Sequence, residues 1–413
     1  MKKKIPLICI ITIIIGIILL FMFFLLKPNN TASIGPTQEE LTIIKQNAKN
    51  IINKNTEISS YNIDSSNNDE SVILVKGKTL LTLKDSIIIK SDGQKSDKEN
   101  SIKKGTNSAI IVGYNSSLHG ENIKIKTTQE NSNALFIGGK NSRIKLSNST
   151  LETKNSNSHG IVSVLNSKVD AQNITIKTTS LQSSAIKTDN SSIINIENSL
   201  LETNSKTSPV ISSNGEINLS KANIISNNSS IANIEGGKLS ISNSTLLSYG
   251  EEVGTNIYSA FYISSNNSTI NINNSKINIS NSNYNKTTIF TIHNSKTTLT
   301  LKNNQINYGS NNILDIYDSS ITLNLLNQTL TGNINFNGNS NLTLNIKEKS
   351  IYMGNINPDN YNNDITINLD NTSKLILTGD TYIKELNNTN HNNTNIAFGN
   401  YDLYINGQKL NKE

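Results

Sequence analysis

The chain has 413 residues, a formal net charge of +6, and only 35% hydrophobic and 16% charged residues. About one residue in six is Asn and about one in eight is Ser, a composition typical of repetitive, low-complexity or disordered chains. Cys9 is the only cysteine, which excludes a disulfide-stapled domain and any metal or redox site built from several cysteines.

The N-terminus has the pattern of a membrane anchor. Three lysines precede an apolar run at residues 5–26, which is long enough to cross ~30 Å of hydrocarbon as a helix and too long for a typical signal-peptide core. We therefore expect a single-pass protein in the cell membrane, with residues 1–4 cytoplasmic and an extracellular domain after a linker at 27–36. The alternative is a protein secreted after signal cleavage, because residues 31–33 are small.

The positive charge belongs mainly to this anchor. Four lysines lie in its flanks and no acidic residue occurs before Glu39, which leaves 33 basic residues against 31 acidic ones in the rest of the chain. Arg143 is the only arginine, and nucleic-acid recognition favours clustered arginines and lysines. We expect no nucleic-acid partner.

A helix is predicted next. Residues 37–40, Thr-Gln-Glu-Glu, form a capping-box pattern, and apolar residues follow at helical spacing. The sequence predicts an amphipathic helix at about 38–54, inside an N-terminal cap at 37–60. Its expected role is to cover the first turn of the repeat that follows, since an open solenoid end exposes apolar interior and unpaired strand edges.

From about residue 61 to 380, aliphatic residues alternate with polar ones in short runs, which is the pattern of β-strands. A longer and nearly constant period is superimposed on this alternation. A small residue followed by apolar ones recurs at Ala109, Ala134, Gly160, Ala185 and Pro209. A period in the range of about 20 to 50 residues is the signature of a solenoid.

Asparagine marks the corners of the repeat. One column contains Asn115, Asn141, Asn166, Asn190, Asn214, Gly236, Asn267, Asn294, Asp318 and Asn339. A second column contains Asn148, Asn173, Asn198, Asn223, Asn243, Asn274 and Asn304. Asn and Gly tolerate the left-handed backbone of a sharp corner, and asparagines stacked ~4.8 Å apart can join their amides in a ladder.

These patterns predict an all-β protein, a parallel β-helix with three strands per coil and roughly ten coils over residues 61–380. The polar stretches at 91–107 and 249–258 are predicted to be loops. A C-terminal cap is expected at 381–413, with a poorly ordered loop at 387–395 and a hairpin whose type I′ turn is Asn406-Gly407.

Four segments carry a family resemblance: SVILVKGKTLLTLKDSIIIKSDG (71–93), NSAIIVGYNSSLHGENIKIKTT (107–128), NALFIGGKNSRIKLSNSTLET (133–153) and QTLTGNINFNGNSNLTLNIKEKS (328–350). They resemble adhesin-like right-handed parallel β-helix surface proteins, which share the pectate-lyase-like fold. The resemblance implies a right-handed β-helix and adhesion or surface carbohydrate binding. This chain differs in being richer in Asn and Lys and poorer in Gly.

Enzymes of this fold set a test that the sequence does not pass. Arg143-Ile144-Lys145 matches the Arg-x-Lys strand of polygalacturonases and Ser158-His159-Gly160 approximates their Gly-His-Gly turn, but the chain has no Asp-Asp pair. Acidic pairs occur only in polar loops, and the four histidines are scattered. We expect no catalytic residue, no metal site and no cofactor.

Tyrosines provide the candidate binding residues. Tyr249, Tyr258 and Tyr262 cluster near the second loop and Tyr284 follows one coil later, so exposed rings could stack on sugars. The alternative is that they are ordinary strand residues. The function expected from the sequence is adhesion or surface glycan binding without catalysis. The alternatives are a polysaccharide lyase or glycoside hydrolase, and a structural cell-surface spacer.

Overall fold

The computed structural model describes residues 35–91, 97–250, 259–265, 267–280, 288–309 and 311–410. The predicted membrane helix at residues 5–26 lies outside them. Within the described ranges, no helix is long and apolar enough to cross a membrane.

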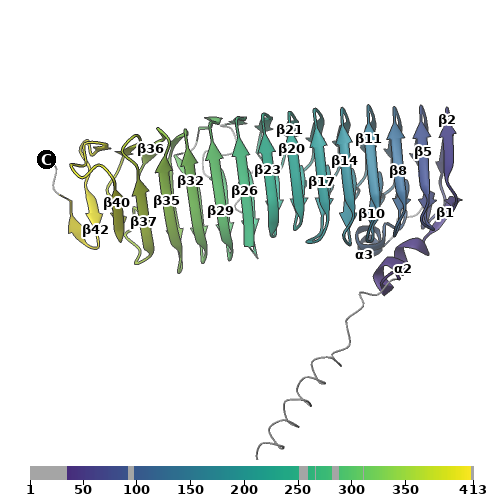
Figure 1. Cartoon of the computed structure of the whole chain (residues 1–413), viewed down its shortest axis with the longest axis horizontal. Coiled ribbons are helices and arrows are strands. Elements are labelled where there is room, and N and C mark those ends of the chain that lie inside the picture. Colours follow the sequence, from purple (N-terminus) through teal and green to yellow (C-terminus); the bar gives the residue numbers. More distant parts are fainter. Residues whose placement is uncertain are drawn as a thin grey trace, which may run out of the picture. The chain divides into compact units, whose positions relative to one another are not determined.

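Residues 39–413 form one unit, a parallel β-solenoid in which each coil as far as residue 307 contributes a strand to each of three sheets (Figure 1). Sheet A contains β1 (Asn47–Ile52), β4 (Glu70–Val75), β7 (Ile110–Val112), β10 (Leu135–Gly138), β13 (Ile161–Val164), β16 (Ile186–Thr188), β19 (Ile211–Ser213), β22 (Ala232–Ile234), β25 (Phe261–Ser264), β28 (Phe290–His293), β31 (Asn312–Tyr317) and β34 (Asn333–Asn337).

Sheet B contains β2 (Thr56–Ser59), β5 (Leu80–Lys84), β8 (Ser117–Glu121), β11 (Arg143–Ser147), β14 (Lys168–Gln172), β17 (Ile193–Glu197), β20 (Glu216–Ser220), β23 (Gly237–Ser242), β26 (Asn267–Asn273), β29 (Lys296–Lys302), β32 (Ser320–Leu326), β35 (Asn341–Lys347), β37 (Asp364–Leu369) and β40 (Glu385–Asn388).

Sheet C contains β3 (Asn62–Ser65), β6 (Ile87–Lys90), β9 (Lys124–Thr127), β12 (Thr150–Thr153), β15 (Thr175–Thr178), β18 (Leu200–Thr203), β21 (Asn223–Ser226), β24 (Thr245–Ser248), β27 (Lys276–Ile279) and β30 (Gln305–Asn307). Two smaller sheets follow at the C-terminal end: β33 (Thr329–Thr331), β36 (Ile351–Gly354), β38 (Lys374–Leu377) and β41 (Ile396–Ala397), then β39 (Thr381–Ile383), β42 (Leu403–Ile405) and β43 (Gln408–Lys409).

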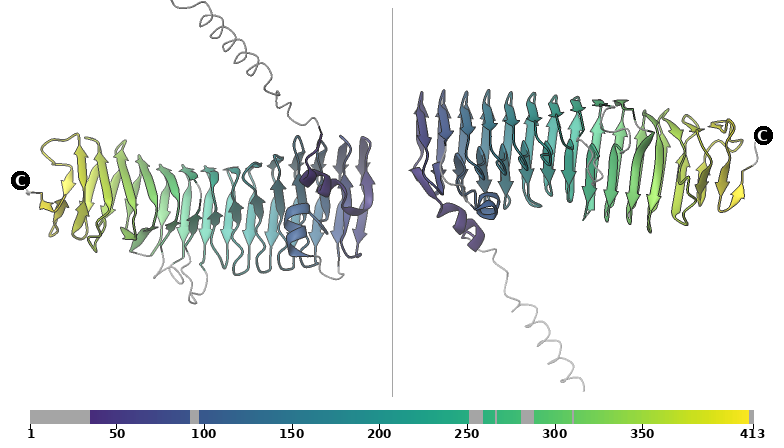
Figure 2. Two further views of the ribbon diagram at one scale, coloured as in Figure 1. Left: turned by 90° about the horizontal axis from the view of Figure 1, so that it is seen from below. Right: turned by 180° about the vertical axis from the view of Figure 1, so that it is seen from behind.

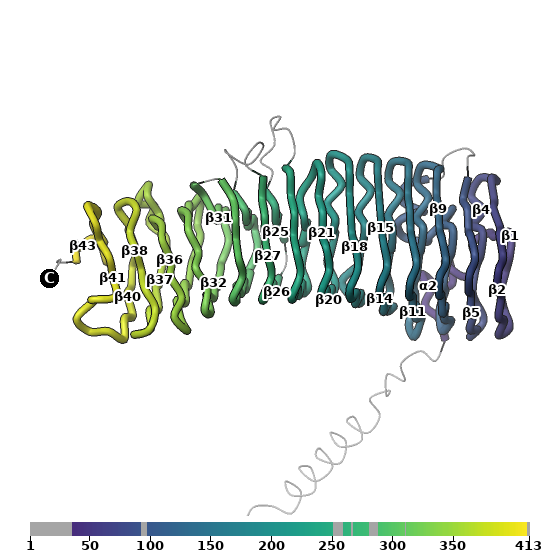
Figure 3. Tube along the Cα trace, turned by 90° about the horizontal axis from the view of Figure 1, so that it is seen from above, coloured from purple at the N-terminus to yellow at the C-terminus, as the bar shows by residue number. Residues whose placement is uncertain are grey.

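The predicted parallel β-helix with three strands per coil is therefore confirmed, but it has about 13 turns instead of ten (Figure 3). The coils begin at Asn47, before residue 61, and continue past residue 380. The estimate was low for a second reason, because the C-terminal coils are shorter than the N-terminal ones. Thr322 pairs with Thr343, for example, whereas Lys145 pairs with Asp170.

Aliphatic side chains from all three sheets fill the interior, because alternate residues of each strand point inward. Phe261 and Phe290, paired in register on neighbouring coils, stack with ring centroids 5.0 Å apart. Serines line the buried side of the corners. Ser149 and Ser199, for example, accept the backbone N–H groups of Ile123 and Ile174, so the corners bury few unpaired donors.

Many corner asparagines adopt the left-handed conformation that their positions predict, as at Asn148, Asn173 and Asn198, where φ is 50°, 54° and 49°. Their amides form the expected ladder. Asn173 donates to Asn148 at 3.2 Å and Asn198 donates to Asn173 at 2.6 Å. The first column is confirmed only in part, because its members Asn190, Asn214, Asn267 and Asn339 do not have a positive φ. The predicted second column is displaced at two coils, where Lys221 and Asn303 occupy the left-handed position instead of Asn223 and Asn304.

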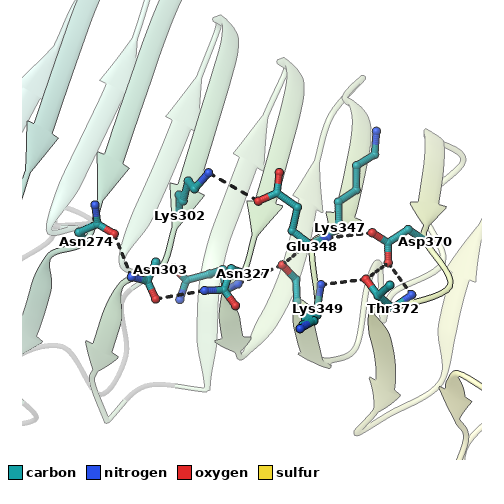
Figure 4. Close-up of polar contacts among 11 residues, drawn as sticks. Asn274, Lys302, Asn303, Asn327, Lys347, Glu348, Lys349, Asp370 and Thr372 are labelled. Atoms are coloured by element: carbon teal, nitrogen blue, oxygen red, sulfur yellow. Dashed lines mark hydrogen bonds and ion pairs between the residues drawn. The ribbon is translucent and has the colours of Figure 1, made fainter.

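The ladder continues toward the C-terminal end (Figure 4), where Asn303 donates to Asn274 at 2.9 Å and Asn327 to Asn303 at 3.3 Å. At the next corner Glu348 has a φ of 57°, and its backbone N–H donates to Asp370 at 2.8 Å. A carboxylate one coil on therefore replaces the amide of the asparagine ladder.

The N-terminal helix is shorter than predicted. α2 spans Gln38–Ile44, and the following residues form strand β1 instead of continuing to residue 54. Apolar residues at this spacing fit both patterns, and the strand forms because it pairs in parallel with β4. α2 lies on the flank of the solenoid, where Ile43 packs on the outer face of sheet A in one cluster with Ala48 of β1, Phe136 and Val162.

The stretch at 91–107 was wrongly predicted to be only a loop, since residues Lys98–Lys104 form helix α3. Asp97 caps its first turn by accepting the N–H of Asn100 at 2.9 Å, and Gly105 ends the helix with a φ of 72°. Asn133 fixes α3 to sheet A by donating to the Ser101 carbonyl at 3.1 Å. Figure 2 shows α2 and α3 on one flank of the N-terminal coils.

The C-terminal hairpin is confirmed: β42 and β43 pair antiparallel around Asn406 and Gly407, which both have positive φ. Residues 387–395 differ from the predicted poorly ordered loop. Asn388 donates to Asn393 and Asn395 at 2.9 and 2.8 Å, so side-chain amides bridge the turn. The prediction of poor order rested on the many asparagines of this segment, but asparagine side chains can also hydrogen-bond to one another and so order a turn.

Candidate functional site

A groove of about 800 Å³ follows the outer face of sheet B across seven strands, from β5 to β23. Neighbouring strands lie ~4.8 Å apart, so six such steps give the groove a length of about 29 Å along the stack of coils. Its floor includes the backbone of inward-facing positions such as Gly120, Leu146 and Ala171. The groove is therefore a feature of many coils together and not of one loop.

Two rows of outward side chains line the groove, because the strands keep a constant register. Row one contains Thr82, His119, Lys145, Asp170, Asn195, Asn218 and Ser240. Row two contains Lys84, Glu121, Ser147, Gln172, Glu197, Ser220 and Ser242. A polymer lying in the groove would meet a new pair of side chains at every coil.

Part of row one is held by internal contacts. Asn195 donates to Asp170 at 2.7 Å, Asn218 donates to Asn195 at 2.9 Å, and Lys168 lies 3.1 Å from the Asp170 carboxylate. In contrast, His119 and Lys145 make no side-chain hydrogen bond or ion pair within the described ranges of the chain. Partial burial, together with the charge of Lys145, lowers the pKa of His119. The N-terminal part of the groove thus offers a neutral imidazole beside a cation.

The four predicted tyrosines do not form one site among the residues that the structure describes. Tyr258 and Tyr284 lie outside these residues. Tyr249 follows β24 of sheet C, is 48% exposed, and borders a hollow of about 420 Å³ that Tyr308 also lines. Tyr262 lies on β25 of sheet A and is half-buried. The two described rings therefore belong to different sheets, and the tyrosine site remains a prediction.

The partial polygalacturonase pattern is not assembled. Arg143 and Lys145 are outward residues of sheet B, whereas His159 lies next to β13 of sheet A and is 5% exposed. The Nδ1 atom of His159 accepts the backbone N–H of Ser184 at 3.0 Å. Burial, with Lys187 and Lys98 nearby, lowers its pKa to about 3. This imidazole is a neutral corner residue that is closed to solvent.

The acidic residues give no metal cluster: across the described ranges, no group of three or more His, Cys, Asp or Glu side chains is placed to hold an ion. Glu152 and Glu202 do occupy one column of sheet C, two coils apart, with Lys177 between them in register. Lys177 pairs with Glu202 at 3.0 Å and Lys154 with Glu152 at 3.2 Å. Both carboxylates are therefore partners of lysines.

The sequence did not identify the groove residues as a set. In the sequence His119 is one of four scattered histidines, and Lys145 belongs to the Arg-x-Lys match at 143–145. The repeat period could have identified row one, because the central outward residue of each sheet B strand belongs to this row, as Lys145 and Asp170 do. A comparison with protein-family models returned no match to this chain, and a comparison with curated proteins returned no relative.

Proposed function

We propose that this protein binds an extended polysaccharide along the groove of sheet B, as a membrane-anchored surface β-helix acting in adhesion and without catalysis. The observation that carries the proposal is the groove itself, with two polar rows that repeat at every coil over seven strands. A linear polymer with regularly spaced hydroxyl groups is complementary to such a row. The membrane location rests on the apolar run at residues 5–26, and the right-handed, adhesin-like character rests on the resemblance described above.

Binding rather than turnover is proposed because two of the three acids that line the groove are held by other side chains. Asp170, the acidic residue of row one, contacts both Lys168 and Asn195, and Glu197 of row two pairs with Lys221 at 2.8 Å. Glycoside hydrolysis needs two carboxyl groups that flank the scissile bond, one of them protonated. These carboxylates are instead engaged with cations and an amide.

The test uses the purified full-length chain and three variants on a panel of plant, mucin and microbial polysaccharides. We expect wild type to bind at least one of them. Ser147→Trp places a large ring at the third of the seven positions of row two and should weaken binding by about tenfold or more. Thr322→Trp is the matched control, because Thr322 faces outward from β32 of the same sheet, beyond the groove. Tyr249→Ala tests the tyrosine site in the same assay.

Retained binding by Ser147→Trp, or an equal loss in Thr322→Trp, would contradict the groove as the site. Loss in Tyr249→Ala alone would move the site to sheet C. Release of reducing ends or unsaturated products from the bound polysaccharide would replace binding with catalysis.

A further inference from the structure

We infer that the part of the groove at β11, together with the corner before this strand, is a recognition site for an anionic group, a carboxylate or a sulfate ester, carried by the bound polysaccharide. This inference rests on the proposed function and narrows its ligand to an acidic glycan. Four basic side chains, Lys140, Arg143, Lys145 and Lys168, gather there, and they include the single arginine of the chain.

The register of sheet B brings the cations together. Arg143 and Lys145 are alternate residues of β11, so both face outward, about 7 Å apart along the strand. Lys168 lies beside Arg143 on the next coil. Lys140 and Arg143, with Lys168, line a second hollow of about 370 Å³ at the corner before β11, and the described residues that line it include no carboxylate.

Several other cations near the groove are already paired. Lys84 pairs with Glu57 at 3.1 Å, Lys221 with Glu197 at 2.8 Å, and Lys238 with Glu216 at 3.4 Å. In contrast, the side chains of Lys140, Arg143 and Lys145 have no hydrogen bond or ion pair to any residue that the structure describes.

Two carboxylates, those of Glu40 and Asp170, lie beside the three cations of the second hollow without lining it. Glu40 is 4% exposed, and its Oε1 atom accepts the backbone N–H of Lys140 at 2.5 Å. Lys168, the third cation of the hollow, is the one that has an acidic partner, Asp170 at 3.1 Å. The hollow therefore carries a local excess of positive charge.

The identity of Arg143 adds specificity to this charge. A guanidinium presents a rigid fork of donors that matches two oxygens of a carboxylate or sulfate, whereas a lysine acts as a hydrated point charge. Lysine provides all of the positive side-chain charge elsewhere in the chain, apart from any charged histidine. Arg143 is exposed on β11 beside lysines, and is thus placed to bind an oxyanion with two hydrogen bonds.

A sparse anionic polymer fits the groove better than a nucleic acid does. Glu121, Asp170 and Glu197 line the same groove, so a backbone with a phosphate at every step would meet repulsion along its length. A polysaccharide can place its acidic group at the cluster and neutral hydroxyls along the rest of the two rows. Lys145 belongs to both the groove and the cluster, which connects the two sites.

The experiment compares probes that share one extended backbone: hydroxyethyl cellulose, carboxymethyl cellulose and cellulose sulfate, with single-stranded DNA as a fourth probe. Affinity for the full-length chain is measured at low and physiological salt. We expect one or both anionic celluloses to bind about tenfold or more tightly than the neutral one, with the preference falling as salt rises. The carboxymethyl and sulfate arms decide which anionic group is preferred.

The variants assign that preference to the cluster. Arg143→Gln should remove it while leaving affinity for the neutral cellulose unchanged, and Arg143→Lys should restore only part of it because the fork is lost. Lys296→Gln is the matched control, since Lys296 is an exposed lysine of β29 on the same sheet, outside the groove.

Equal affinity for all three celluloses, or equal losses in Arg143→Gln and Lys296→Gln, would overturn this inference and leave the proposed function standing. Tighter binding to DNA than to either anionic cellulose would also overturn it. Failure to bind any cellulose or any other polysaccharide would overturn both proposals.

Discussion

His159 fills a buried corner position that Asn133 fills one coil earlier. The Asn133 side-chain oxygen accepts the backbone N–H of His159 at 2.9 Å, and the Nδ1 atom of His159 accepts the N–H of Ser184 at 3.0 Å. The two side chains therefore perform the same task on successive coils, but only the imidazole can take up a proton. A protonated Nδ1 could no longer accept the Ser184 bond.

This difference predicts the effect of acid. Burial first, and then the nearby lysines, lower the pKa of His159 to about 3 in the folded chain, whereas an unfolded histidine titrates near 6.5. As pH falls below about 6.5 the unfolded state binds a proton that the folded state does not, so the free energy of unfolding decreases until about pH 3. His159→Asn keeps the acceptor and removes the titration.

We expect the wild type to lose about 2 kcal/mol more than His159→Asn between about pH 6.5 and about pH 4.5, by urea unfolding followed by circular dichroism. Other acid-sensitive groups are the same in both proteins, so only the difference between the two is attributed to His159. An identical decrease in both proteins would contradict the assignment of this pKa.

At the scale of elements, α2 is attached to the flank of the solenoid by two close contacts. A Cβ on Gly138 would lie 2.5 Å from Ile43, and one on Gly113 would lie 2.5 Å from Ile44, so the glycines leave room for the two isoleucines. Ile43 is fully buried in an apolar cluster on the outer face of sheet A. This face of β4, β7 and β10 would otherwise expose apolar side chains to water.

Removal of the Ile43 side chain should therefore release the helix without unfolding the sheet. We expect Ile43→Ala to cost about 2–4 kcal/mol in helix docking and to raise hydrogen exchange over residues 38–46, with β7 and β10 still protected. Ile51→Ala is the control, because Ile51 is 46% exposed on β1. The same increase in Ile51→Ala, or none in Ile43→Ala, would contradict this docking.

The sequence predicted the coils, but it overestimated the length of α2 and missed α3, for a physical reason. Alternation and corner asparagines are local signals that repeat many times, so the strands of sheets B and C could be located from pattern alone. α2 and α3 are short helices that are held by contacts with distant strands. An indirect signal was present in the unbroken apolar run Val72–Val75, which indicates a strand buried on both faces and hence a covering element.

The groove depends on longer-range information still. Each lining residue looks like an ordinary polar strand residue, and the site exists only because His119 and Lys145, which are one coil apart in the sequence, come into register. A shift of one residue in any coil would turn these side chains inward. Once the register between coils is known, the repeat period predicts which residues form each row. It does not predict that the outer face of sheet B has a groove along these rows.

At the scale of residues 39–413, the outer face of sheet B divides into two chemically distinct halves. The N-terminal half carries the charged groove. The C-terminal half continues row one through Asn271, Thr300, Asn324, Asn345 and Asn368, whereas row two continues through Asn273, Lys302, Leu326 and Lys347. Asn345 donates to Asn324 and Asn368 to Asn345, both at 2.7 Å, which joins neighbouring strands along row one. Row one is therefore uncharged in this half, and the charge of Lys302 in row two is paired with Glu348 at 3.6 Å.

The one-dimensional stacking of coils predicts how far the destabilising effect of a substitution extends. Each coil pairs only with its neighbours, so a defect at one end should not destabilise distant coils. Leu403 is fully buried on β42, which pairs with β39 and with the closing strand β43. Leu403→Asp places a charge in the last apolar layer and should undo this closure.

We expect Leu403→Asp to raise hydrogen exchange over about residues 375–410 while β10 to β17 keep wild-type protection. Loss of the hairpin also leaves β39 unpaired, so the variant should self-associate in size-exclusion chromatography. Tyr401→Asp is the matched control, because Tyr401 is 39% exposed and lies close to Leu403 in the sequence. Loss of protection extending to β10 would contradict this prediction and would show that the coils unfold as a single cooperative unit. In that case a ligand bound at the groove would stabilise the C-terminal coils as strongly as the coils it touches.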